Sequence, residues 1–132
     1  MALQRGDYAE AMRLLRPLAE RADARAQTDL GLMYDNGRGV PKDYGQAVAW
    51  YHKAKEQGYE AAQNDLGVMY ALGQGVPQDY VQAYMWFNLA GSHASDAETR
   101  GKAIKNCGEA AAKMTPDQIA EAVRLASEWK PK

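Results

Sequence analysis

The sequence predicts an all-α protein built from stacked pairs of antiparallel helices and closed by a C-terminal helical cap. A 25-residue stretch, residues 26–50, recurs 36 residues later as residues 62–86, and 16 of its positions are identical. Each copy contains two helical patterns joined by a turn rich in glycine and proline. A repeat of this length is typical of helix-pair proteins, in which each unit buries its apolar face against its neighbours.

The length of 132 residues fits one helical-repeat domain. Within residues 1–132 we expect four parts: a leading half-repeat (1–24), two repeats (25–58 and 59–94) and a C-terminal helical cap (95–132). The half-repeat is indicated by Asp7, Tyr8 and Ala11, which align with Asp43, Tyr44 and Ala47 at the same offset. We therefore expect that the protein starts with a half-unit or that preceding sequence is missing.

The first helix of each unit carries Ala26, Leu30 and Tyr34 on one face in the first copy. Gly31 lies inside this helix and recurs as Gly67, although glycine in a helix costs up to about 1 kcal/mol relative to alanine. Its recurrence predicts that a neighbouring helix approaches too closely for a side chain. A Gly-x-Gly-Val-Pro turn then ends the helix, because proline cannot continue it.

The second helix of each unit begins at an aspartate followed three residues later by glutamate or glutamine, which is the spacing of a capping box. These pairs are Asp7 with Glu10, Asp43 with Gln46, and Asp79 with Gln82. Aromatic residues and alanines then recur every three or four positions, as on an amphipathic helix. We expect Trp50 and Trp86 in the core and the helix end near Gly58, since glycine readily closes helices.

The C-terminal third departs from the repeat, because Glu98 and Lys102 occupy positions that a third copy would fill with alanine and leucine. Thr115, Pro116 and Gln118 form a strong helix start. Apolar stripes on either side of it predict two helices that cover the last repeat. The stripes are Ala97, Ile104, Cys107, Ala111 and Met114, and then Ile119, Ala122, Val123, Ala126 and Trp129.

The repeated pattern Ala-Gln-x-x-Leu-Gly-x-Met-Tyr-x-x-Gly-x-Gly-Val-Pro-x-Asp-Tyr-x-x-Ala-x-x-Trp resembles the Sel-one-like repeat, a branch of the tetratricopeptide-like α-solenoid superfamily. The resemblance covers about residues 6–92. It implies a right-handed α/α superhelix and a bacterial adaptor or scaffold that binds proteins without catalysing a reaction. The motif is structural, so it implies no catalytic, cofactor-binding or metal-binding residue.

Charge and composition narrow the function classes. The 16 basic and 17 acidic side chains alternate along the chain, so we expect no nucleic-acid partner. The apolar stretches are too short to insert into a membrane. No secretory leader is visible in this sequence, which leaves the localisation unknown: we expect a cytoplasmic protein or, if a leader was removed, a periplasmic or secreted one. One cysteine excludes an internal disulfide.

Few residues suggest chemistry. His52 and Glu56 have the spacing of two metal ligands on one helix face, but the second copy lacks both, which favours a solvated surface. His93 is interpreted as a solvated loop residue and Cys107 as a small buried apolar residue. We expect no cofactor and no enzyme. The alternatives are an enzyme or enzyme-regulating domain with hydrolase-like activity, and a structural spacer in a longer repeat array.

A position-by-position comparison of the two copies suggests a binding surface. The first-helix positions that differ lie on one face, away from the repeated apolar residues. In helix-pair solenoids the first helices line the concave surface. We therefore predict that a protein or peptide partner binds a shallow groove there. Its residues are Thr28, Leu32, Asp35, Asn64, Val68 and Ala71, with Gln27 and Gln63 at its edge.

The half-repeat suggests a second contact. Tyr8, Ala11, Leu14, Leu15 and Leu18 form an apolar face that no preceding first helix covers in this sequence. We predict a weak homodimer through this edge or an upstream helix that covers it.

Overall fold

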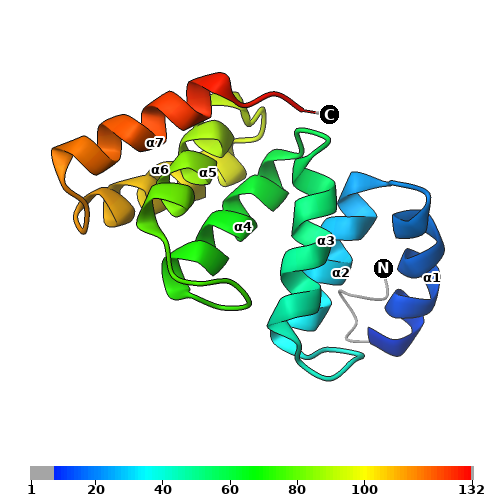
Figure 1. The fold of residues 1–132 in the computed structure, drawn as a ribbon. Coiled ribbons are helices and arrows are strands. Elements are labelled where there is room, and N and C mark those ends of the chain that lie inside the picture. The colour runs from blue at the N-terminus through cyan, green and yellow to red at the C-terminus, as the bar shows by residue number, and fades with distance from the viewer. Residues whose placement is uncertain (1–7, 132) are drawn as a thin grey trace.

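The computed structural model describes residues 8–131 and is all-helical over that range, as predicted (Figure 1). Consecutive helices pack against each other from the first to the sixth, and the seventh folds back onto the fifth. No helix among the described residues is long and apolar enough to cross a membrane. The helices are α1 (Tyr8–Glu20), α2 (Ala24–Asn36), α3 (Tyr44–Lys55), α4 (Glu60–Leu72), α5 (Tyr80–His93), α6 (Ala97–Ala111) and α7 (Pro116–Glu128).

The predicted capping aspartates are confirmed where the structure describes them, but the reciprocal half of the box is not formed at Asp43 and Asp79, because their N–H groups donate to the carbonyls of Tyr34 and Tyr70. The carboxylates of Asp43 and Asp79 each accept a hydrogen bond from the backbone N–H three residues on, at 3.1 Å. Thr115 and Gln118 form the complete reciprocal capping box at the start of α7. The third predicted capping aspartate, Asp7, lies outside the described residues.

Only some of the helices end at the glycines that were predicted to close them. Gly37 closes α2 in the left-handed conformation, with φ 67°. Helix α3 instead ends at Lys55, three residues before the predicted end, because Gly58 closes the turn that follows the helix. Gly58 takes φ 80° in that turn, and its N–H donates to the Lys55 carbonyl at 2.9 Å.

The glycines inside α2 and α4 mark close helix contacts, as predicted. A Cβ built on Gly31 would lie 2.6 Å from Cδ1 of Tyr51 on α3. A Cβ on Gly67 would lie 2.7 Å from Cδ1 of Phe87 on α5, the corresponding ring of the next repeat. The same interlock of glycine and aromatic ring therefore joins the two helices of each unit.

Both predicted core tryptophans are buried, Trp50 with 9% and Trp86 with 4% of its surface exposed. Trp50 packs with α1 and α2, whereas Trp86 belongs to a larger cluster that includes Tyr51 and Leu66. The apolar core thus runs through successive units, as a stacked architecture requires.

The cap contains the two predicted helices, but its apolar stripes are partly wrong. Helix α6 buries Ala103 and Ala110, whereas Ala97 is exposed and Ile104 is 60% exposed. On α7, Val123 is 43% exposed, and Leu125 packs on the core instead. Spacing defines a helix face only to within about one residue of rotation, and contact with both α4 and α5 selects the small alanines of α6.

The C-terminal segment reaches back to the first full repeat (Figure 1). Trp129 packs edge-on against Trp86, with ring centroids 5.5 Å apart. A Cβ on Gly58 would lie 3.4 Å from Cγ of Pro131. Helix α7 and the residues after it therefore close the side of the solenoid formed by α3 and α5.

Candidate functional site

Five of the eight predicted groove residues line two hollows that share α4 and α6 as walls. Thr28, Leu32 and Asn64 line the first, and Val68 and Ala71 line the second. Along α4, Asn64, Val68 and Ala71 follow one another on a single face. Thr28 and Asn64 are themselves buried, with 4% and 7% of their surface exposed, whereas Leu32 is 38% exposed, so the varying positions are open only in part.

The first hollow, here called the acidic hollow, encloses about 550 Å³ between α2, α4 and the start of α6. It is lined by four carboxylates and two basic side chains. The carboxylates are Asp29, Asp65, Asp96 and Glu98, and the basic residues are Arg25 and Lys102. Lys102 pairs with Glu98 at 3.0 Å, and Asp96 caps α6 by accepting from the Thr99 N–H.

Burial has the largest effect on the pKa values of two aspartates that line the acidic hollow. It raises the pKa of Asp65 to about 7, with a further rise from Asp35 and an opposing effect from Lys102. Burial also raises the pKa of Asp29, against the charge of Arg25. Both carboxylates would be stabilised in their charged form by an additional cation in the hollow.

The second hollow, here called the apolar hollow, encloses about 310 Å³ between α4, α5 and α6. Val68, Leu72, Tyr80 and Phe87 form most of its apolar lining. Asn64 on α4 accepts a hydrogen bond from Asn106 on α6 at 3.1 Å, and Asn106 also lines this hollow. The two asparagines thus join the walls where the acidic hollow passes into the apolar one.

The other three predicted residues, Asp35, Gln27 and Gln63, line neither hollow. Tyr51 O–H donates to Asp35 at 3.2 Å, so this carboxylate supports the buried ring of α3. Gln27 and Gln63 are 4% and 2% exposed, so they do not form the groove edge that was predicted. Gln27 donates to the Ala19 carbonyl and accepts from Gln57, both at 3.0 Å, and so connects two turns.

The sequence did not reveal the wall that α6 contributes. Lys102, Asn106 and Glu109 line the hollows, but they lie in the segment interpreted only as a cap. Comparison of the two repeats could not identify these residues, because α6 has no second copy in the sequence.

The residues considered for chemistry are dispersed. Burial, with a smaller effect from Lys55, lowers the pKa of His52, so its imidazole is neutral at pH 7. Cys107 is only partly buried, contrary to prediction, and burial raises the pKa of its thiol, which disfavours the thiolate. No three His, Cys, Asp or Glu side chains come together as a metal site within residues 8–131.

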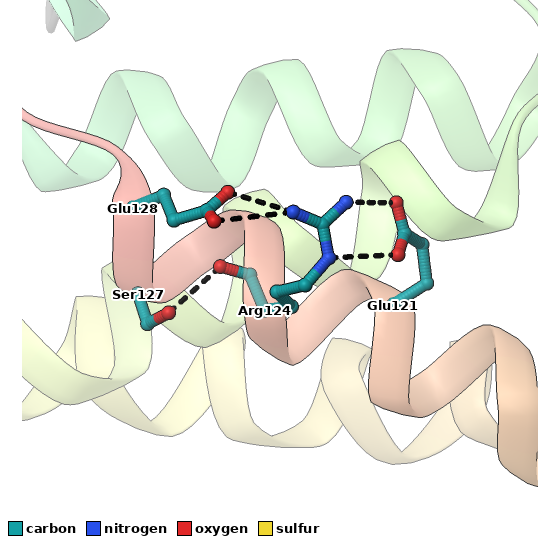
Figure 2. A network of polar contacts seen from close by, with 4 residues as sticks. All are labelled: Glu121, Arg124, Ser127 and Glu128. Carbon is teal, nitrogen blue, oxygen red and sulfur yellow. Dashed lines mark hydrogen bonds and ion pairs between the residues drawn. The ribbon is translucent and has the colours of Figure 1, made fainter.

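A charged network on α7 is part of the helix surface. The Arg124 guanidinium lies between Glu121 and Glu128, at 2.6 and 2.9 Å, and Ser127 donates to the Arg124 carbonyl (Figure 2). All of these side chains come from one helix at spacings of three or four residues, which is how exposed ion pairs support a helix. The network therefore forms part of the polar exterior of the cap.

The sequence and the fold of this chain are similar to those of known proteins. A family model described as Sel1 repeat matches residues 24–59 and 60–95. A protective antigen present in uropathogenic Escherichia coli strains, described as displaying an SLR fold, is similar over 92% of this chain at 35% identity and a TM-score of 0.86. This chain spans only 25% of that protein. A Sel1 repeat protein from Oxalobacter formigenes is similar over 74% of this chain and 70% of its own length, at 39% identity and a TM-score of 0.66. No curated protein matches the chain.

Proposed function

We propose, because the chain belongs to the Sel1 repeat family, that it is a non-catalytic adaptor whose partner peptide lies along α4, over the two hollows. Sel1 repeat proteins are generally protein-interaction modules. The observation that carries the finer proposal is the position of the two hollows, which follow each other along α4 at residues that differ between the repeats.

The chemistry of the hollows defines the partner that we propose. A lysine or arginine of the peptide enters the acidic hollow, where Asp29 and Asp65 lie. An aliphatic or aromatic side chain of the same peptide enters the apolar hollow beside Val68 and Phe87. Buried apolar anchors supply much of the affinity of such interfaces, and charge complementarity selects the partner.

A random peptide library displayed on phage tests this proposal. Selected peptides should combine a basic residue with a large apolar one and should shift the NMR signals of α4 and α6. Val68→Glu should abolish binding because it places a charge in the apolar hollow. Val81→Glu, on α5 outside both hollows, is the matched control and should leave binding unchanged.

Two results would count against the proposal. Peptides that bind the folded Val68→Glu variant as tightly as the unmodified protein do not use the apolar hollow. Signal shifts confined to α1, α3 or α7, which line neither hollow, would place the binding surface elsewhere.

A further inference from the structure

A third cavity, of about 520 Å³, lies away from both hollows, between the α3–α4 turn, the end of α5 and the C-terminal segment. Leu89, Trp129 and Pro131 provide apolar walls, and the polar ones are Gln57, Gln63, His93 and Ser127. We call it the C-terminal cavity. Its mixed lining suits a ligand with an apolar stem and a polar end.

Gln63, one of the lining residues, carries a buried acceptor that lacks a donor. Gln63 is 2% exposed, and its Oε1 has no hydrogen-bond partner. Buried side-chain oxygens in folded proteins are nearly always paired, because an unpaired one loses its interaction with water without compensation. The unpaired oxygen therefore requires an explanation specific to this place.

The first repeat shows how the same position is normally satisfied. Gln27, the counterpart of Gln63, accepts a hydrogen bond at 3.0 Å from the side-chain amide of Gln57. The donor is thus a carboxamide supplied by the turn that follows the second helix. That turn is the connection between α3 and α4.

The second repeat supplies no such carboxamide. His93 replaces Gln57 at the corresponding position, so an imidazole stands where the first repeat has a carboxamide. Helix α5 also continues to His93, whereas α3 ends at Lys55, the counterpart of Gly91. The following turn therefore differs from its counterpart, and the C-terminal cavity lies beside both Gln63 and His93.

We propose that the C-terminal cavity binds the side-chain carboxamide of a glutamine or asparagine in a partner peptide. Its N–H donates to Gln63 Oε1, as Gln57 does to Gln27 in the first repeat. Its methylene groups pack on Leu89 and Trp129. Because Oε1 is covered from solvent, the Gln63 side chain rotates toward the cavity when the ligand enters. This site is independent of the groove along α4.

A stability comparison tests the unpaired oxygen without any ligand. Gln27→Leu breaks two hydrogen bonds and should lower the melting temperature. Gln63→Leu removes an unsatisfied acceptor and should leave the melting temperature unchanged or raise it. An equal loss in both variants would mean that Gln63 is already satisfied in solution, and it would overturn the proposal.

A binding experiment tests the ligand class. The three tryptophans are labelled with 5-fluorotryptophan, and capped glutamine (N-acetylglutamine N′-methylamide) is titrated up to its solubility limit. The fluorine signals of Trp129, which lines the cavity, and of Trp86, which packs against Trp129, should shift. The signal of Trp50, in the other core cluster, should not. The capped leucine analogue, and capped glutamine on Gln63→Leu, should bind roughly fivefold more weakly, as expected for one net hydrogen bond.

The other outcomes overturn the proposal. Equal affinity for the glutamine and leucine probes would reduce the cavity to an apolar contact. Shifts of all three tryptophans would indicate non-specific binding, and the lack of any shift would show that the cavity does not take the carboxamide. Val68→Glu should leave this titration unchanged, so failure here is distinguishable from failure of the groove along α4.

Discussion

Substitution of Gly31 by alanine tests the interlock that joins the two helices of a unit. The added Cβ would lie 2.6 Å from Cδ1 of Tyr51, well inside van der Waals contact. The ring has little room to move, because Tyr51 is 0% exposed and its O–H is bonded to Asp35. Helices α2 and α3 must therefore separate to accept the methyl group.

Two opposing effects determine how much Gly31→Ala changes the free energy of unfolding. Replacing glycine by alanine inside a helix stabilises it by about 1 kcal/mol. Overpacking of a tight core costs about 1–3 kcal/mol, and this clash lies at the upper end because both helices are held by further packing. We expect a net loss of about 1–2 kcal/mol in the free energy of unfolding.

Gly101 on α6 is the matched control, because a Cβ built there meets nothing within 4 Å. Gly101→Ala should gain up to about 1 kcal/mol from helix propensity alone. Urea unfolding followed by circular dichroism at 222 nm measures both variants. Equal stabilisation by Gly31→Ala and Gly101→Ala would refute the interlock, and Gly67→Ala against Phe87 repeats the test in the second unit.

Three further predictions concern other parts of the fold. Burial raises the pKa of Asp65 from 3.8 to about 7, so the folded state keeps a proton that the unfolded state releases between about pH 4 and 7, and stability falls as pH rises through that window. Asp65→Asn should therefore gain on the order of 4 kcal/mol over the unmodified protein at pH 8 and about 1 kcal/mol at pH 4.5 in urea titrations; an equal difference at both pH values would contradict this. Trp86→Ala should cost about 3–5 kcal/mol, because the ring is 4% exposed, and an unchanged melting temperature would contradict its place in the core. Leu14 and Leu18 are 51% and 44% exposed on α1, and the predicted weak homodimer should appear in light scattering at high concentration and weaken in Leu14→Glu; a strictly monomeric mass would exclude it.

Comparison of the repeats predicts part of the lining of the two hollows, because repetition separates packing residues from the others; the binding groove itself stays a prediction. Residues that every unit needs for stacking must recur, so the positions that differ are free of that requirement, and Thr28, Asn64 and Val68 do lie beside hollows. Gln27 and Gln63 were misplaced because a polar side chain suggests exposure. Their burial depends on partners from distant turns, which sequence spacing does not reveal.

The sequence by itself determined the helices, their order and their pairing, because caps, glycine turns and apolar periodicity are local signals repeated at a fixed interval. Tertiary structure alone decided which face of each cap helix is buried, which carboxylate has a raised pKa and which acceptor is left without a donor. These properties depend on the angle and depth at which α6 and α7 meet the last repeat. That contact occurs once in the chain, so no second copy reveals it.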